Sequence, residues 1–527
     1  MATFGTKIFN TAISSLNAQQ AVLAGISNNI ANANTPGYAR RTVQLTNQTL
    51  GEPSLGLNIG SGVKVSDVER RVDEYINSAL RGTISEKEAA STENDFISRI
   101  ENLFDLTGTY QTVGTSLTDF FSALNDLSAD PSSLELRANL YERANDLVNS
   151  INLAYNTISD LQNEADNRLA TEISTINTLT AQIADLNQKV VKRENSGAVA
   201  ADERDMRDHL LEQLAEKISF SVTELSDGSI NVSLDGGIDL VHGSISRDLE
   251  VTRSPSFAGS TSPVSLSGSV PYYVVINYGT ESSPAHVNLT STLSSGEGTL
   301  AGLLRIRGVY DSSDTSPFEG NGVLPAAASR IEAITRYLLT TFNNTYLGGG
   351  NAVDLDGNNP SVYGFFDFDF SGTKDADGNG VPDDLGNHSG VTNYSSILKL
   401  GISDARNIAA GTTSGAPGDG SNLSSLIALQ TTSASFSSDS AGSYTYTGTI
   451  EEVYRDGVTY VGNKKANSDT QLALAESNYE AAANNRDEVS AVSIDEEFAS
   501  LVKYQKAYEA SARLINVAND LLDQIML

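Results

Sequence analysis

Both ends of the 527-residue chain carry long apolar heptads, and these constrain the fold more than any other feature. Near the N-terminus the period is carried by Phe9, Leu16, Leu23 and Ile30, with Ala12 and Ile26 in the companion position. Near the C-terminus it is carried by Ile494, Leu501, Tyr508, Ile515 and Leu522, with Phe498 and Ala512 alongside. A seven-residue period gives a narrow apolar seam that suits a second helix. Because each end supplies one such helix, the sequence predicts that the two terminal helices pair with each other.

The N-terminal helix lacks the charges that a solvated helix usually carries on its outer face. No charged residue occurs from Ile8 to Ala39, although the formal net charge of the chain is −32. The segment is therefore either an ordinary core helix or a helix that protein surrounds on most sides. One narrow seam offsets little of the conformational entropy lost when a long helix is ordered. We therefore expect both termini to become helical only when they pack against neighbours.

Polar residues interrupt both seams. Gln19, Gln505 and Asn519 occupy seam positions. Buried polar groups at such positions fix the register and the number of partners, at some cost in stability. We expect these three residues to have that role.

The first helix ends in the string NNIANANTPGY, residues 28–38, which holds more stop signals than one turn needs. The helix stop comprises Asn34, Thr35, Pro36, Gly37 and Tyr38. Thr35 precedes a proline and is disfavoured in the helical region, and Pro36-Gly37 suits the central positions of a type II turn. Asn34 can cap the last carbonyls, and Tyr38 offers an apolar ring with a polar tip. The set is expected to fix the direction in which the chain leaves the helix.

Between the ends the chain reads as helices, then strands, then helices again. Residues 134–192 contain neither Gly nor Pro. They predict a helix of about 90 Å at ~1.5 Å per residue, with one interruption. Short alternating segments between about 218 and 318, separated by Asp-Gly and Gly-Gly turns, predict strands. Helical patterns return on both sides of 346–420, a segment rich in Gly, Asn, Asp and Ser.

The predicted fold class is therefore α+β multidomain. It combines paired terminal coiled-coil helices, a long-helix bundle domain with β-hairpin segments, and an inserted β-rich outer module. The expected boundaries are 1–66 with 492–527 for the terminal helical domain and 346–420 for the acidic outer module. The mainly helical domain would comprise 67–345 with 421–491, and would carry the β-rich segment at about 218–318.

Composition excludes several classes of function. The chain has no cysteine, which removes disulfides, thiol catalysis and thiolate metal sites. Its four histidines are scattered without an HExxH pair, so neither a zinc enzyme nor a Ser-His-Asp triad is indicated, and we expect no enzyme. The charge of −32 opposes binding to nucleic acid or to an anionic membrane. No run of about 18 apolar residues predicts a membrane span, and the N-terminus does not read as a cleaved signal peptide.

One acidic stretch, KDADGNGVPDD at residues 374–384, has the pattern of a calcium loop. Asp375, Asp377 and Asn379 occupy alternate positions, Gly380 follows, and Asp383 comes next. Alternate oxygens of this kind can converge on one Ca²⁺ ion, and the glycine permits the sharp turn. The bidentate acid of a full EF-hand is missing. The competing interpretation is a solvated acidic turn built from Asp-Gly pairs.

The two ends also resemble known signatures. NNIANANTPGYARR resembles the N-terminal signature shared by the axial proteins of the bacterial flagellum, namely rod, hook and hook-associated proteins. The run SIDEEFASLVKYQKAYEASARLINVANDLLDQIML resembles the matching C-terminal signature. Its DEE, YQxAY and SARxI elements are similar to the family of hook-associated proteins at the hook–filament junction. ADERDMRDHLLEQLAEKI and GDGSNLSSLIALQ resemble segments of that same family, whereas 347–417 has no match.

This resemblance implies a secreted, extracellular structural subunit of the flagellum without enzymatic activity. Such a subunit is exported through the flagellar type III pathway and assembles under the filament cap as a homo-oligomeric ring, through its terminal helices. Its partners would be further copies of itself and hook protein on one side. A second junction protein or flagellin would lie on the other side, and an export chaperone would bind before secretion.

Two other functions remain open at this point. Another flagellar axial protein, hook or distal rod, shares the N-terminal signature. A secreted calcium-binding surface or adhesive protein with coiled-coil ends would explain the acidic middle of the chain, but not NNIANANTPGY. A secreted hydrolase has no recognisable site in the sequence.

Overall fold

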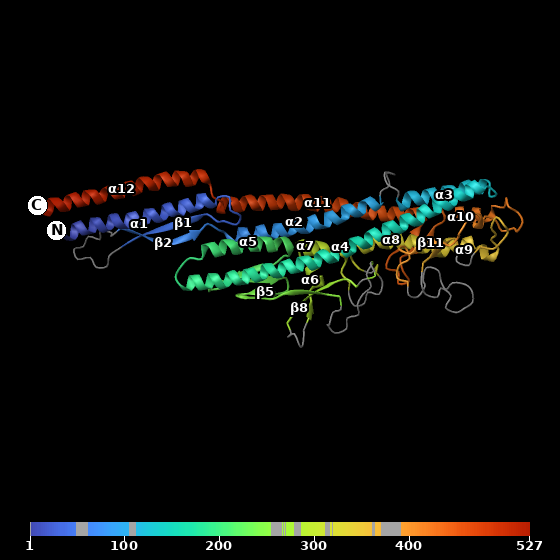
Figure 1. Cartoon of the computed structure of the whole chain (residues 1–527), viewed down its shortest axis with the longest axis horizontal. Helices are drawn as coiled ribbons and strands as arrows, with labels where there is room; N and C mark the ends of the chain where they lie inside the picture. Colours follow the sequence, from blue (N-terminus) through green and yellow to red (C-terminus); the bar gives the residue numbers. More distant parts are fainter. Residues whose placement is uncertain are drawn as a thin grey trace. The chain divides into compact units, whose positions relative to one another are not determined.

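The computed structural model of the 527-residue chain is 62% helical. It describes most of the chain, in the following ranges: 2–48, 62–104, 112–253, 270–278, 286–310, 320–360, 364–369 and 391–526, with a few single residues between them. Side-chain environments are described from position 9 to position 520. Long helices and small antiparallel sheets follow one another along the chain (Figure 1). The predicted α+β class is therefore confirmed.

The chain divides into two compact units. Unit 1 comprises Met1–Ser85, Ile176–Arg247 and Glu476–Leu527, and unit 2 comprises Glu86–Thr175 and Asp248–Ala475. Three helices contribute residues to both units: α2 (Glu74–Glu101), α4 (Leu134–Asn195) and α11 (Ile450–Ser490). The division into three domains expected from the sequence stays a prediction.

Unit 1 contains both termini. Helices α1 (Ala2–Asn32) and α12 (Ile494–Met526) lie antiparallel, side by side (Figure 1). A two-stranded antiparallel sheet, β1 (Arg41–Asn47) with β2 (Val63–Arg70), also packs against α1. The sequence patterns did not predict this hairpin. It gives α1 a second protein neighbour within its own chain, which accounts for part of its uncharged surface.

The rest of unit 1 is α5 (Ala201–Lys217) and a four-stranded antiparallel sheet. Its strands are β3 (Ser221–Glu224), β4 (Ile230–Leu234), β5 (Ile238–His242) and β6 (Ile245–Ser246). Ile230, Val232 and Leu234 are buried at alternate positions of β4, as the period of two predicts. Gly236 and Gly237 have φ of 93° and 78°, which the tight β4–β5 turn requires.

Unit 2 is built on helices, with three small sheets among its described residues. Its helices are α3 (Val113–Ala129), α6 (Thr290–Ser295), α7 (Thr299–Arg307), α8 (Val323–Tyr337), a π-turn at Leu338–Phe342, α9 (Asn343–Tyr346) and α10 (Ser421–Ala428). One sheet comprises β7 (Leu249–Thr252), β8 (Tyr273–Asn277) and β9 (His286–Asn288). A hairpin of β12 (Ala434–Ser437) and β13 (Thr445–Gly448) precedes α11.

The described part of 346–420 holds little regular structure. Strands β10 (Phe366–Phe368) and β11 (Leu398–Leu400) pair antiparallel, and Val353 forms an isolated bridge with Gly411. Phe365 and Phe366 pack edge-on against Phe342, so this segment is anchored in the core of unit 2 by aromatic contacts.

One long helix differs from the sequence expectation. The interruption predicted within 134–192 is wrong, because α4 runs for 62 residues without a break. Helix stability in a folded protein comes mainly from tertiary packing, which carries α4 through residues whose own helical pattern is weak.

Candidate functional site

The α1–α12 pair contains most of the terminal residues singled out by the heptads. Ile26 and Ala12 are buried in α1, and Phe9, Leu16, Leu23 and Ile30 are half-buried. In α12 Leu501, Tyr508 and Ile515 are half-buried. Between the two helices the Oγ atoms of Ser15 and Ser511 lie 2.8 Å apart, and Gln20 Nε2 donates to the Tyr508 hydroxyl at 3.4 Å. The side chain of Leu522 lies outside the described part of the structure.

The companion line of α12 differs from the expected one. Phe498 is 51% exposed and Ile494 is 43% exposed, so neither is covered within the single chain. The buried line is instead Glu497, Ser511 and Ala518, with the half-buried Tyr504 between them. It alternates with Leu501, Tyr508 and Ile515 at spacings of three and four. A line of this composition has no apolar period, so the pattern drew attention to the adjacent Phe498.

The polar register residues also differ from expectation. Gln505 and Asn519 are exposed, and only Gln19 is half-buried. The polar groups that α12 does bury along its seam are Glu497 and Ser511, which are 2% and 6% exposed.

The helix stop forms the predicted tight turn. The Tyr38 amide donates to the Thr35 carbonyl at 3.2 Å, and Gly37 has φ of 76°, as the third residue of a type II turn requires. A Cβ atom on Gly37 would lie 2.8 Å from Cβ of His209 in α5. Gly37 is therefore required both by the backbone conformation and by the close approach of a neighbouring helix.

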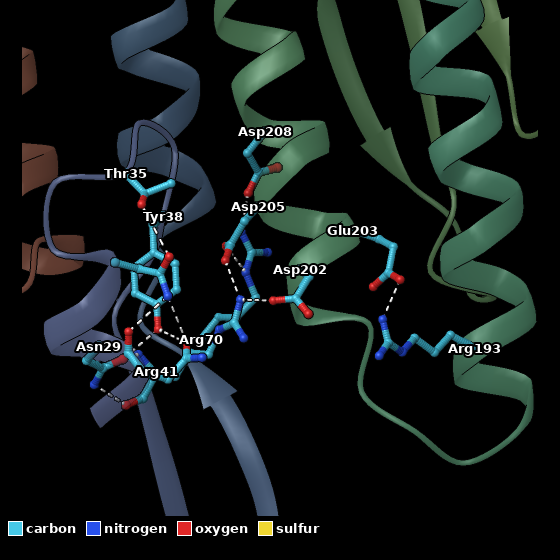
Figure 2. Close-up of polar contacts among 12 residues, drawn as sticks. Asn29, Thr35, Tyr38, Arg41, Arg70, Arg193, Asp202, Glu203, Asp205 and Asp208 are labelled. Atoms are coloured by element: carbon cyan, nitrogen blue, oxygen red, sulfur yellow. Dashed lines mark hydrogen bonds and ion pairs between the residues drawn. The ribbon is translucent and has the colours of Figure 1, made fainter. Parts of the chain in front are cut away.

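Asn29 holds the chain after this turn, although no sequence pattern singled it out. Its side chain is buried on α1, where Nδ2 donates to the Arg41 carbonyl at 2.9 Å and Oδ1 accepts from the Arg41 amide at 3.0 Å. Oδ1 also accepts the Tyr38 hydroxyl at 2.8 Å (Figure 2). One asparagine therefore pairs both backbone groups of Arg41, as a neighbouring strand would, and turns the exiting chain back along α1.

Tyr38 supports the same arrangement. Its hydroxyl also donates to Asn28 Oδ1 at 2.9 Å, and the Arg41 guanidinium stacks 5.0 Å from the centre of its ring. Burial raises the pKa of the Tyr38 hydroxyl to about 12, so it stays protonated as a donor across the physiological range.

Three acidic residues at the start of α5 fix the arginines of β1 and β2. Arg41 Nη2 donates to Asp202 Oδ1 at 2.6 Å and to Asp205 Oδ2 at 2.8 Å. Arg70 Nε donates to Asp205 Oδ1 at 2.8 Å, and Arg70 also bonds Asp208 (Figure 2). The acidic residues recur every three positions and so share one face of α5, near an N-terminus that favours negative charge.

The electrostatics of this cluster depend on burial. Desolvation raises the pKa of the Asp205 carboxyl above its usual range, against the opposing effect of Arg70 and Arg41. Both arginines are nearly buried, so removing either an arginine or Asp205 would leave an unpaired charge in a nearly buried site. The cluster therefore ties the end of the hairpin to α5.

Arg40 bonds residues at the start of α12. Its Nε donates to Glu497 Oε1 at 2.7 Å and its Nη1 to Glu496 Oε2 at 2.8 Å. Its backbone amide donates to the Ser490 carbonyl at 3.0 Å, and its carbonyl accepts from the Arg71 amide at 2.8 Å. Two consecutive arginines thus connect the helix stop to two different helices.

We call this group the joint: the turn Thr35–Tyr38, Asn29, Arg40, Arg41, Arg70, and the carboxylates of Asp202, Asp205, Asp208, Glu496 and Glu497. Two surface hollows flank it. One, of about 560 Å³, is lined by Pro36, Tyr38, Leu186 and Met206 among others. The other, of about 300 Å³, lies between the turn and the α11–α12 connection at Ser490–Val492. Most polar groups of the joint bond one another, although the buried Arg41 Nε has no hydrogen-bond partner among the described residues, and the arrangement suits a mechanical connection.

The candidate calcium ligands Asp375, Asp377, Asn379 and Asp383 lie outside the described residues. Within the described part of the chain, no three His, Asp or Glu side chains gather closely enough to hold a metal ion. The upstream Asp354 bonds the amides of Asp356 and Asn358, and Asp356 pairs with Arg406. Over the same described residues, no helix has the length and apolar character needed to cross a bilayer.

Comparison with known proteins gives concordant matches along the chain. The family described as flagellar hook-associated protein FlgK helical domain matches residues 97–363, slightly more than half of the chain. The family described as flagella basal body rod protein matches 9–38, and the C-terminal family of the flagellar basal body rod FlgEFG proteins matches 483–526. The last two matches contain the helix stop and α12.

Individual relatives cover almost the whole chain. Flagellar hook-associated protein 1 of Salmonella typhimurium is 27% identical over 99% of each chain. The proteins of the same name from Escherichia coli K12 and Bacillus subtilis 168 are each 25% identical, over 99% and 98% of this chain.

A solved structure, that of the flagellar hook junction protein FlgK from Burkholderia pseudomallei, matches with a TM-score of 0.59. It covers 78% of this chain and 100% of its own, at 14% identity, and so shows a shared fold. Because the hook-associated helical domain matches more than half of the sequence, the chain belongs to the family of flagellar hook-associated proteins of the FlgK type, which are non-enzymatic structural components of the bacterial flagellum.

Proposed function

We propose that this protein forms a ring of identical subunits between the hook and the filament, and that its terminal helices make the contacts between copies. It would be exported by the flagellar type III pathway and act outside the cell. The hook junction protein among its structural relatives, and the hook-associated name of its sequence relatives, support this position.

The observation that carries the proposal is the outer face of α1. Its exposed residues recur at spacings of three and four, as on a helix that packs against another helix. They are Asn10, Ile13, Asn17, Gln20, Ala24, Ser27 and Ala31, and Thr11 and Asn28 are exposed beside this line. None is charged, in a chain of net charge −32. A surface this long without charge suits close contact with further copies, because like charges would repel across a ring of identical subunits.

Exposed apolar residues on α12 extend the same argument. Phe498, Val502, Leu514 and Val517 are each more than half exposed. Large apolar side chains in this number on one terminal helix are typical of an interface. Phe498 and Ile494, which the heptads placed in the terminal seam, would then make assembly contacts between copies.

The joint would give every copy the same geometry. Asn29 and the Arg41–Asp205 pair fix the path of the chain after the turn, and Arg40 connects that path to α12. In a ring the exit direction must be identical in each subunit, and a flexible connection would not ensure it. This supports an assembly role for Asn34, Thr35, Pro36, Gly37 and Tyr38.

The further partners follow from this position. Hook protein would contact the ring on one side, and a second junction protein or flagellin on the other. The filament cap would retain the subunit during assembly, and an export chaperone would bind it before secretion. A calcium-binding surface protein with coiled-coil ends offers no reason for the joint, and a hook or distal rod protein is less consistent with the match at 97–363.

Deletion of the gene tests the position in the flagellum. We expect hooks without filaments, with filament protein lost to the medium. Normal filaments in the deletion strain would contradict the proposal.

A single added charge tests the ring contacts. Ala24→Glu places a carboxylate on the outer face of α1, at an exposed helical position where glutamate is a good helix former. We expect the variant to be exported and to fail to restore filaments in the deletion strain. Ala181→Glu, at an exposed position of α4, is the matched control and should restore them. Full restoration of filaments by Ala24→Glu would show that the outer face of α1 does not lie in the interface between copies.

Truncation tests whether neighbours complete the helices. We propose that the joint is ordered in the free chain, because α5 holds it, whereas α1 and α12 beyond it gain full helicity in the ring. Removing residues 1–32 and 494–527 should then cost less circular dichroism signal than the 31 and 33 helical residues of α1 and α12 would give. Loss of the full signal would show that both helices are already complete in the free chain.

A further inference from the structure

The structure points to Glu497 and Arg40 as the pair that sets the register of α12 against α1. This pairing lies within one chain and does not depend on the ring. The buried carboxylate of Glu497, whose place in the seam would otherwise be unfavourable, determines which register of the two helices is stable.

Apolar burial alone leaves the register of this pair poorly defined. The seam of α1 repeats Leu16, Leu23 and Ile30, and that of α12 repeats Leu501, Tyr508 and Ile515. Sliding one helix past the other by seven residues, about 10.5 Å along the axis, exchanges one apolar side chain for another of similar size. Something other than the seam must therefore distinguish the native register from its neighbours.

Glu497 makes that distinction. It lies on the buried line of α12, where it is 2% exposed, and the other members of that line, Tyr504, Ser511 and Ala518, are uncharged. A buried carboxylate is tolerated only when it is paired and hydrogen-bonded. In this register its partner is Arg40, whose Nε lies 2.7 Å from Glu497 Oε1.

Arg40 keeps its position even if α12 shifts along α1. Its backbone amide bonds the Ser490 carbonyl, and its carbonyl accepts from the Arg71 amide. The next residue, Arg41, is held on both backbone groups by Asn29 and through its side chain by Asp202 and Asp205. The guanidinium of Arg40 is therefore presented at one fixed place beside the end of α1.

The uncharged surface of α1 makes shifted registers of α12 unfavourable. A shift of α12 toward the N-terminus of α1 would carry Glu497 against the segment from Ile8 to Ala39, which contains no cation. The carboxylate would then be buried without a counter-ion, and Arg40 would keep only the exposed Glu496 or neither acid. A shift in either direction separates Glu497 from Arg40, and a shift toward the N-terminus of α1 also buries the carboxylate against a surface that holds no cation.

Disulfide trapping measures the register directly, since the chain has no native cysteine. Ser15→Cys with Ser511→Cys reports the native register, in which the two Oγ atoms lie 2.8 Å apart. Ser15→Cys with Tyr504→Cys, or with Ala518→Cys, reports a shift of one heptad in either direction. Each pair is placed in the full-length chain and oxidised under identical mild conditions. The crosslinked fraction is then read on a denaturing gel, and trapping captures the pairing even while the helices open and close.

Four backgrounds separate the effect of the Arg40–Glu497 pair on the register from other effects. In the otherwise native chain we expect the 15–511 pair to dominate. Glu497→Leu, which suits the apolar seam and leaves Arg40 without its buried partner, should lower that yield and raise the 15–504 or 15–518 yield several-fold. The exchange Arg40→Glu with Glu497→Arg should restore the native pattern. Glu509→Leu, an exposed position on the same helix, is the matched control and should change nothing.

Two results would overturn the inference. If Glu497→Leu forms the 15–511 crosslink as efficiently as the native background, with no shifted product, the short α11–α12 connection and not the ion pair sets the register. If the native background gives no preference for 15–511, the two helices do not hold one register at all. Neither result bears on whether the protein forms a ring, which the filament assay with Ala24→Glu decides.

Discussion

Replacing Asn29 by alanine should release the chain where it leaves α1. The substitution removes a donor to the Arg41 carbonyl at 2.9 Å and an acceptor for the Arg41 amide at 3.0 Å. The Tyr38 hydroxyl loses one acceptor and keeps the other, Asn28 Oδ1 at 2.9 Å. Each lost hydrogen bond is worth about 1 kcal/mol, and a part-buried group left unpaired costs more, so the local cost is about 3 kcal/mol.

Amide hydrogen exchange of the full-length chain measures this cost locally. A change of about 3 kcal/mol corresponds to roughly 100-fold faster exchange at the Arg41 amide and along β1. The matched control is Asn28→Ala, one position earlier and exposed, which should change exchange by less than about 0.5 kcal/mol. Asn29→Asp keeps the acceptor and loses the donor, so its effect should be intermediate. If Asn29→Ala exchanges no faster at Arg41 than Asn28→Ala does, the asparagine does not hold the joint.

Three further predictions follow from the joint, from the acidic loop and from one carboxylate of unit 2. Pro36→Ala with Gly37→Ala should spare export and impair filament attachment, because alanine at 37 is strained at φ 76° and its Cβ would meet His209; normal motility would return the turn to an ordinary loop. Calorimetric titration of the full chain with Ca²⁺ should give binding heat that Asp375→Asn with Asp377→Asn abolishes; an absence of heat in the native chain would exclude the calcium loop. Asp419 accepts hydrogen bonds from the amides of Thr412, Thr413 and Ser421, and these hold the pKa of its carboxyl well below the usual 3.8. A lowered pKa gives stability that is present above about pH 3.8 and is lost as the pH falls toward the folded-state value. Asp419→Ala should therefore lower the free energy of unfolding at pH 7 and leave it unchanged at the lowest pH. An equal loss at both pH values would contradict this.

Much of the architecture follows from local sequence. The heptads at both ends predicted α1 and α12, and the alternating segments with Asp-Gly turns predicted the strands after position 218. The Pro36-Gly37 pair predicted a type II turn. These features are readable because their causes lie within a few residues of each other, in side-chain period and backbone preference. The signatures at the two ends also indicated the family.

Other features required the folded chain. The hairpin β1–β2 was missed because its pairing joins residues on either side of the segment between Asn47 and Val63. The continuity of α4 was missed because packing carries the helix through weak points of its pattern. Phe498 was placed beside the α12 seam where Glu497 is buried, because an apolar period cannot indicate that a buried position holds a glutamate.

The joint separates what the sequence predicts from what only the folded chain decides. Sequence alone determined that the helix stops at the Thr35–Tyr38 turn, and that a long uncharged helix precedes it. Asn29, Arg40 and Arg41 were visible in the same string, and Asp202, Asp205 and Asp208 recur at helical spacing far along the chain. Only the tertiary structure decided that Arg41 meets Asp205 and Arg40 meets Glu497, because charge pairing acts over a few ångströms in space and has no signature in sequence separations of 164 and 457 residues.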